Sequence, residues 1–420
     1  MAGIALILLL ALGLRLGWSL SRPVDDASID ALPDQREYLS LARNLLDGRG
    51  LQFWDGRFSA TVWAFRTPGY PLFLAAGGGN IRAARTVQAL LDTSTVLAIF
   101  LLARSVAPEL GRQRLGLVAA ALVAVNPYLI YFSGLILSET LFTAMLVWGM
   151  VLLVHGGGGR DRSWRKTAVW LCGGGLLALS VLVRPSAIAL PVVLGIVAAF
   201  VNRSNRADFD PGRTGFRGPL LIGLTMGLLV VAALLPWGLR NHRILGRWVW
   251  LDTSGGFTLY DGYNPAATGG SDQSFIQHDS ALKTLSEVDR SDYLSHTAME
   301  YVRDHPGRVW ELVWLKLART WSPMPLSREY GRPIYRLIGL TYSLPFDVWI
   351  ILGLWCGALP RSAKVFLIAP AIYLSAVHAL TVGSLRYRMP AEGPMAIVAA
   401  GLVATRGVAD PDWRRSHSHP

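Results

Sequence analysis

Two acidic residues stand where a carboxylate is costly unless it has a role. Asp34 follows Pro33 at the start of an amphipathic helical pattern, and Glu139 lies inside the apolar stretch NPYLIYFSGLILSETLFTAML. A carboxylate at a membrane boundary is a functional candidate by default, and it can take a proton from a hydroxyl or amine. The alternatives are structural. Asp34 suits a helix N-cap with Glu37 three residues on, which the residues alone favour, and Glu139 suits a helix N-terminus capped by Ser138.

Several arginines are predicted on the same side of the membrane as these acids. They are Arg66 in FRTPGYPLF, Arg240 in LPWGLRNHRILGRW, and Arg386 and Arg388 in GSLRYRMPAEGP. The guanidinium fork matches phosphate oxygens and can stabilise a departing phosphate, although lipid headgroup binding explains one or two of them equally well. Carboxylates and arginines at a bilayer boundary together suit group transfer from a lipid-borne phosphate.

Other catalytic and metal-binding patterns are not legible in the sequence. No Ser-His-Asp or Cys-His arrangement is recognisable, and His278, His296 and His305 share a segment without metal-ligand spacing. Cys172 and Cys356 lie in apolar segments and form neither a metal spacing nor a disulfide framework. We therefore expect no metal site and no required cofactor, although the pattern allows a divalent metal.

The composition is that of a membrane protein. The chain has 420 residues, of which 52% are hydrophobic and 16% charged, whereas a soluble domain carries nearer a quarter charged residues. Its apolar blocks approach the roughly 20 residues that cross a ~30 Å hydrocarbon core. The net charge of +12 is explained by arginines in short loops, as in cytoplasmic loops of membrane proteins, so nucleic acid is not an expected partner. We predict an all-α polytopic protein.

The predicted organisation is a single membrane domain over residues 1–420 with about ten transmembrane helices. The N-terminal segment lacks a basic leading region, so we interpret it as a retained helix in which Arg15 reaches the outer interface. Both termini and the arginine-rich short loops are predicted to be cytoplasmic, including the short tail 406–420. The predicted helices are 3–20, 85–104, 115–133, 139–155, 168–183, 185–202, 218–238, 336–357, 365–382 and 391–405.

Two long segments, 21–84 and 239–335, are predicted to lie on the extracytoplasmic side. Both are rich in aromatic residues, proline and charge. Each contains an amphipathic helical pattern, at 33–47 and 308–321, of the kind that lies in the membrane interface. The candidate acids and arginines lie in these segments or at the helix ends beside them, so we expect an outward-facing site at the bilayer boundary.

The ordered motifs resemble the bacterial GT-C glycosyltransferases related to dolichyl-phosphate-mannose protein mannosyltransferases and the lipid A aminoarabinose transferase. The resemblance spans nearly the whole chain and depends on PDQREYLSLARNLLDGRG, RTPGYPLFLA, NPYLIYFSGLILSETLF, PWGLRNHRILGRW, GYNP and RYRMP. It implies a polyprenyl-phosphate sugar donor used on the extracytoplasmic face, with an acid of the first outer loop as base.

The resemblance also implies roles for individual residues. Asp34, followed by Tyr38, matches the first-loop acid, and Glu139 matches the second acid. Arg66, Arg240, Arg386 and Arg388 match positions that bind donor phosphate, with Tyr387 between the last two as a supporting residue. The sequence departs from the mannosyltransferases, which have an adjacent Asp-Glu pair where this chain has Asp34-Gln35, and from the aminoarabinose transferase, which has lysine in place of Arg66.

The sequence therefore predicts an inverting glycosyltransferase in a bacterial-type inner membrane. Its partners would be a polyprenyl-phosphate-linked sugar donor, the lipid bilayer, and a lipid, protein or glycan acceptor. The alternatives are a lipid or sugar transporter and a non-catalytic protein that binds lipid-linked glycans. Transporters commonly show internal repeats and charges near the midplane, whereas here no repeat is found and the charges gather at one face, which favours the enzyme.

Overall fold

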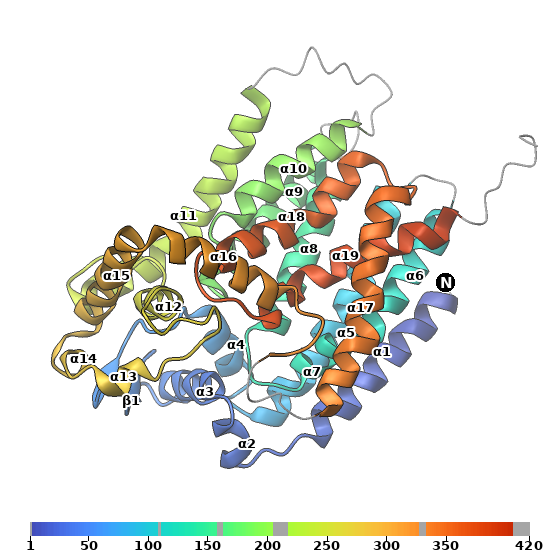
Figure 1. The fold of residues 1–420 in the computed structure, drawn as a ribbon. Coiled ribbons are helices and arrows are strands. Elements are labelled where there is room, and N and C mark those ends of the chain that lie inside the picture. Colours follow the sequence, from blue (N-terminus) through green and yellow to red (C-terminus); the bar gives the residue numbers. More distant parts are fainter. Residues whose placement is uncertain (1, 108–110, 158–162, 205–216, 327–332, 406–420) are drawn as a thin grey trace, which may run out of the picture.

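The computed structural model describes residues 2–107, 111–157, 163–204, 217–326 and 333–405. Every predicted transmembrane segment overlaps one or two helices, and the helical bundle occupies the upper and right-hand parts of Figure 1. Its elements are α1 (Ala2–Ser21), α5 (Ile81–Val106), α6 (Arg112–Ala124), α7 (Pro127–Ser133), α8 (Glu139–Gly157), α9 (Trp164–Ser180), η1 (Pro185–Ala187), α10 (Leu190–Ser204), α11 (Arg217–Leu245), α17 (Pro333–Cys356), α18 (Arg361–Ala379), η4 (Leu385–Arg388) and α19 (Met389–Thr405).

Six helices of the described residues are long and apolar enough to cross a membrane, namely α1, α5, α8, α11, α17 and α18. The pair α6 and α7 makes a seventh if it counts as one span, bent by 56°. The bend falls at Asn126-Pro127, where proline removes a backbone donor and the Asn126 side chain caps the new helix by accepting from the N–H groups of Tyr128 and Leu129. The all-α polytopic fold is confirmed, and the count of ten crossings stays a prediction.

The prediction for Arg15 is wrong, because this side chain is fully buried instead of reaching the interface. Its Nε donates to Asp92 Oδ2 of α5 at 2.6 Å, and its terminal nitrogens donate to the carbonyls of Val123 and Ala124 at 3.0 and 2.8 Å. A charge inside an apolar bundle requires such partners. The pair fixes α1 against α5 and the end of α6.

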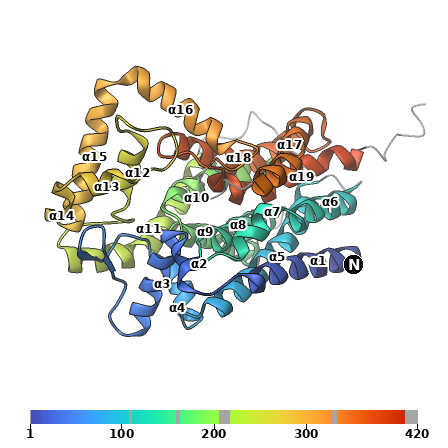
Figure 2. The same cartoon turned by 60° about the horizontal axis from the view of Figure 1, so that its bottom comes forward.

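The two long segments fold outside the bundle, at the same end of the molecule in both Figure 1 and Figure 2. The first holds α2 (Asp26–Asp30), α3 (Pro33–Leu46), an antiparallel pair of strands β1 (Phe53–Asp55) and β2 (Ala60–Val62), and α4 (Gly69–Ala76). The second holds α12 (Gly255–Gly262), α13 (Phe275–His278), α14 (Ala281–Thr284), α15 (Glu287–Asp304) and α16 (Pro306–Thr320).

Specific contacts join the two segments into one body. Phe58 and Phe65 of the first pack on Phe257 of the second in a shared apolar cluster. The N–H of Thr253 donates to the Ala64 carbonyl at 2.9 Å. The Glu287 carboxylate accepts from the backbone N–H groups of residues 63 and 64 at 2.6 and 2.9 Å. The two segments therefore form a common platform over one end of the bundle.

The two predicted amphipathic helices are present as α3 and α16. The helix α3 buries Tyr38 and Leu41, whereas α16 exposes Trp310 and Trp314, at 65% and 61% of their surface. Exposed tryptophans on an amphipathic helix suit the bilayer interface, where the indole ring is favoured.

Candidate functional site

Asp34 is held between two arginines from distant parts of the chain. Its Oδ1 accepts from Arg66 Nη2 at 2.6 Å and its Oδ2 accepts from Arg386 Nη1 at 2.9 Å. Arg66 lies just before α4, and Arg386 lies in η4, the short turn between α18 and α19. The carboxylate therefore joins the first long segment to the C-terminal part of the bundle.

Glu139 lies on the other side of the same arginine. It begins α8, is almost completely buried, and accepts a hydrogen bond from Arg386 Nε. A second guanidinium, from Arg184, lies 3.1 Å from the same carboxylate oxygen, Oε1. The other oxygen, Oε2, has no hydrogen-bond partner among the described residues. Asp34 and Glu139, which the sequence predicts as a pair of catalytic acids, thus face each other across Arg386.

Glu37 extends this network along α3. It accepts from Arg66 Nε at 2.7 Å and from Arg57 Nη2 at 2.7 Å, and Arg57 also pairs with Asp55 at 2.6 Å. We call the residues Asp34, Glu37, Arg66, Glu139, Arg184 and Arg386 the ion-pair cluster. Each carboxylate of this cluster forms ion pairs with two arginines, and for Glu37 the second arginine is Arg57, outside the cluster.

The start of α3 decides how Asp34 is presented. Pro33 occupies the first turn, where its missing N–H is no loss, and the N-cap is Leu32, which makes no side-chain cap. Asp34 is therefore the second helical residue, and its carboxylate bonds to arginines instead of to backbone N–H groups. The interpretation of Asp34 as an N-cap is wrong. One turn later, the Arg66 guanidinium carbon lies over the ring of Tyr38, 5.7 Å from the ring centroid.

The electrostatic balance keeps Asp34 ionised. Burial raises the pKa of this carboxyl, but the charges of Arg66 and Arg386 outweigh burial and hold its pKa well below the usual range. For Arg386, burial acts to lower the pKa, and the carboxylates of Glu139 and Asp34 keep it well above its ordinary value. The cluster is a set of mutually stabilised charges.

One member of the ion-pair cluster, Arg184, and one neighbour of the cluster, Asp252, were missed by sequence reasoning. Arg184 stands at the predicted outer end of the helix 168–183, and this place on the side of the candidate acids is the signal that could have found it. Asp252 lies in the second long segment beside Thr253, close enough to Arg66 to feel its charge. Burial raises the pKa of Asp252 to about 6, and the Arg66 charge and a hydrogen bond from Ser254 offset this only partly.

The structure places the two remaining predicted arginines outside the ion-pair cluster. Arg240 donates to the carbonyls of Trp63 and Leu51 at 2.6 and 2.7 Å, so its hydrogen bonds support the platform. Arg388 is buried between Asp347 of α17 and Glu392 of α19, each at 3.3 Å. Neither arginine contacts Asp34, Glu37 or Glu139. The residue between the two η4 arginines, Tyr387, packs face to face on His378.

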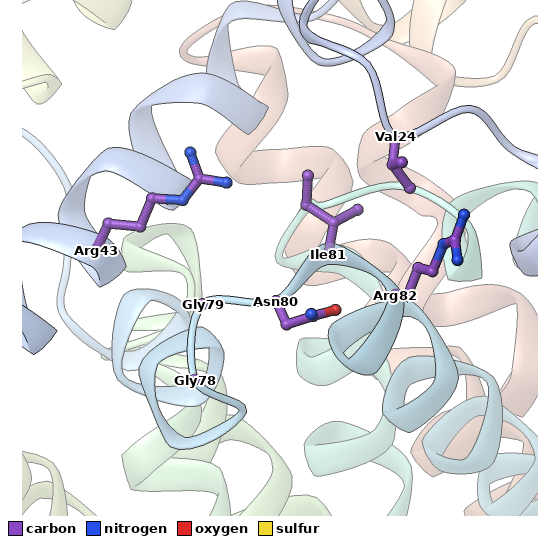
Figure 3. Close-up of a pocket in the computed structure, with 7 residues that line it drawn as sticks. All are labelled: Val24, Arg43, Gly78, Gly79, Asn80, Ile81 and Arg82. Carbon is purple, nitrogen blue, oxygen red and sulfur yellow. The ribbon is translucent and has the colours of Figure 1, made fainter.

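No group of three or more His, Cys, Asp or Glu side chains in the described parts of the chain is arranged to hold a metal ion. A hollow of about 480 Å³ opens on the surface at the turn between α4 and α5 (Figure 3). It is lined by Val24, Arg43, Gly78, Gly79, Asn80, Ile81 and Arg82, none of which belongs to the ion-pair cluster.

The chain resembles solved structures in fold. No protein-family model and no curated protein sequence matches it. The crystal structure of the Archaeoglobus fulgidus oligosaccharyltransferase in the apo form aligns with a TM-score of 0.60 and 12% identity, over 99% of this chain and 52% of that one. The same organism's AglB, in complex with an inhibitory peptide and a dolichol-phosphate, aligns with a TM-score of 0.55 and 11% identity, over 100% and 52%.

These similarities define the class of fold. The chain has the polytopic helical fold of these oligosaccharyltransferase structures, in agreement with the all-α fold that the sequence predicted, and is a multi-pass membrane protein. Within that class it is similar to the archaeal oligosaccharyltransferase AglB, and it spans about half the length of that protein. ArnT from Cupriavidus metallidurans bound to undecaprenyl phosphate also aligns, at 15% identity over 96% of this chain and 77% of that one, but its TM-score of 0.40 is too low to support an inference.

Proposed function

We propose that the protein is a membrane glycosyltransferase that moves a sugar from a polyprenyl-phosphate-sugar donor to an envelope lipid, protein or glycan. The observation that carries this proposal is the ion-pair cluster. Two carboxylates from separate segments, Asp34 and Glu139, meet on one arginine, Arg386, where the platform covers the ends of α8 and α19. Acids that could handle a proton and arginines that could hold a phosphate are thus within one site.

The donor phosphate and Asp34 compete for the same guanidinium groups. When the phosphate binds to Arg66 and Arg386, it takes over hydrogen bonds that Asp34 accepts in the structure at 2.6 and 2.9 Å. Arg184, which pairs with Glu139 alone among the described residues, adds further donors. A released Asp34 oxygen is then able to accept a proton, and its pKa rises as its cationic partners turn to the phosphate.

The transfer is a single displacement. The acceptor oxygen or nitrogen forms a bond to the anomeric carbon while the bond from that carbon to the phosphate oxygen breaks. The electron pair leaves with the polyprenyl phosphate, the acceptor proton passes to Asp34, and the configuration is inverted. Arginines stabilise the charge that develops on the leaving phosphate, and Glu139 orients the acceptor.

Two considerations support this reading beyond the geometry. The sequence motifs resemble those of enzymes that use polyprenyl-phosphate sugars. The AglB structure of similar fold contains a dolichol-phosphate, which belongs to the chemical class of the leaving group proposed here. We also propose that the platform, with the exposed tryptophans of α16 at the membrane interface, faces the extracytoplasmic side of a bacterial-type inner membrane.

The test uses the purified full chain in lipid nanodiscs with a panel of radiolabelled undecaprenyl-phosphate sugars and an envelope extract as acceptor. We expect labelled acceptor and free undecaprenyl phosphate to appear together, and we expect Asp34→Asn and Glu139→Gln to abolish both. Asp47→Asn, at the exposed opposite end of α3, is the matched control. Binding without release of undecaprenyl phosphate for every donor would instead identify a binding protein. Movement of intact donor between the bilayer leaflets would identify a transporter.

A further inference from the structure

His378 is a buried side chain with one unsatisfied nitrogen. It lies in the last turn of α18 and exposes 7% of its surface. Its Nδ1 is 3.4 Å from the Thr381 hydroxyl, whereas its Nε2 is buried and has no hydrogen-bond partner among the described residues. Buried polar atoms almost always have a partner, so a buried nitrogen without one calls for an explanation, and a bound ligand would supply it.

The surroundings of His378 belong to the proposed active site. Its ring packs parallel to Tyr387, with centroids 3.8 Å apart and planes 4° apart. The Arg184 guanidinium lies over the same tyrosine ring, 5.7 Å from its centroid, and Arg386 precedes that tyrosine in the chain. His378 therefore lies beside the two arginines that pair with Glu139. A ligand that met both guanidinium groups and the imidazole would be an anion.

We propose that His378 Nε2 donates a hydrogen bond to a phosphate oxygen of the lipid-linked donor, beside Arg184 and Arg386. This inference rests on the proposed function, since it names a further binding residue for the same donor. The Thr381 hydroxyl donates to the Val377 carbonyl at 3.1 Å and lies 3.4 Å from Nδ1. The tautomer with its proton on Nε2 requires this hydroxyl to turn its single hydrogen from the carbonyl to Nδ1, and a phosphate bound at Nε2 would favour that change. When the hydroxyl donates to Nδ1, the neutral ring carries its proton on Nε2, as donation to phosphate requires.

The competing explanation is that the ring only supports Tyr387 by stacking. His378→Phe separates the two, because phenylalanine keeps a flat ring against Tyr387 and removes both nitrogens. His378→Gln can place an amide N–H near the position of Nε2, whereas His378→Asn reaches only the position of Nδ1. The matched control is His242→Phe, since His242 also stacks on an aromatic ring, Trp248, with centroids 4.5 Å apart, far from the cluster in sequence and contacts.

The experiment measures binding of undecaprenyl phosphate to the purified full chain in nanodiscs, with undecaprenol as the uncharged reference. We expect His378→Phe to weaken binding by about tenfold or more, the size of a lost hydrogen bond to a charged group. His378→Gln should recover part of the lost affinity. His378→Asn should bind as weakly as His378→Phe, and His242→Phe should bind like wild type.

Each outcome has one meaning. If His378→Phe binds within about twofold of wild type, or if His378→Gln and His378→Asn are equally weak, Nε2 does not bind the phosphate and the inference is overturned, while the proposed function stands. If the wild type itself does not prefer undecaprenyl phosphate over undecaprenol, the proposed function fails and takes this inference with it. Should the Phe variant not fold, the Gln and Asn pair still decides the question.

Discussion

Replacing Asp34 by asparagine should separate catalysis from phosphate binding. The substitution keeps the size of the side chain and removes the charge that lies between Arg66 and Arg386. Without a base, the transfer rate should fall by about 10² to 10⁴-fold, the range that general-base catalysis contributes. Binding of the phosphate should not fall, because the two arginines lose a competitor and keep their positive charge.

The size of the binding effect follows from the geometry. A hydrogen bond to a charged group is worth about 1.5–3 kcal/mol when it is buried. The three side chains here are 28%, 22% and 26% exposed, so solvent screens them, and we take about 1 kcal/mol for the exchange. Undecaprenyl phosphate should therefore bind Asp34→Asn about fivefold more tightly than wild type.

Two assays on the same nanodisc preparation test this reasoning, one measuring release of undecaprenyl phosphate from the radiolabelled donor and one measuring its equilibrium binding. Asp47→Asn, at the other end of α3, controls for loss of a charge on the platform. Near wild-type transfer by Asp34→Asn, with Glu139→Gln inactive, would refute the assignment of the base. Binding weakened more than tenfold in Asp34→Asn would refute the competition between carboxylate and phosphate.

Three further predictions concern stability and topology. Burial raises the pKa of Asp252 from 3.8 to about 6, so the folded state loses stability as the pH rises through this interval. Asp252→Asn should therefore melt at a higher temperature than wild type at pH 7.5, and this difference in melting temperature should vanish below about pH 4. Arg388→Met should destabilise the fold by about 3–5 kcal/mol, because Asp347 and Glu392 lose their cationic partner. Adding Glu392→Gln should restore part of the lost stability in thermal melts, and no recovery would exclude the pairing of Arg388 with Glu392. In a variant without native cysteines, single cysteines at positions 164 and 304, both exposed, should react with an impermeant reagent from opposite sides of the membrane, and labelling from the same side would contradict the ten-helix topology.

The helices were predictable from the sequence because burial in lipid leaves a strong and local signal. Long apolar blocks locate the six described helices that are long and apolar enough to cross a membrane, and proline at 127 locates the bend between α6 and α7. The amphipathic helices α3 and α16 were predictable for the same reason, since their apolar stripes recur with helical spacing, whereas their place at the membrane interface stays a prediction. The number of crossings is less certain from pattern alone, because shorter apolar helices such as 185–202 satisfy composition without satisfying length.

The sequence predicted several residues of the candidate site, but it did not predict which acid pairs with which arginine. The types of residue at Asp34, Glu139, Arg66 and Arg386 suggest a site, but which arginine meets which acid depends on contacts between segments up to 352 residues apart. Lone polar residues in apolar surroundings, such as His378, carry no pattern at all. Arg15 shows the converse error, because a charge near a helix end is ambiguous until its partner on another helix is known.

The buried pair of Arg15 and Asp92 has a consequence for how the chain enters the membrane during synthesis. An arginine within an apolar helix opposes insertion by up to about 2.5–3.5 kcal/mol at the helix centre, and an aspartate opposes it similarly. Neither α1 nor α5 is therefore well suited to diffuse alone into lipid. We expect α1 to remain beside the insertion machinery until α5 has been made, so that both helices leave together as a neutral pair and the first long segment is folded back between them from the outset.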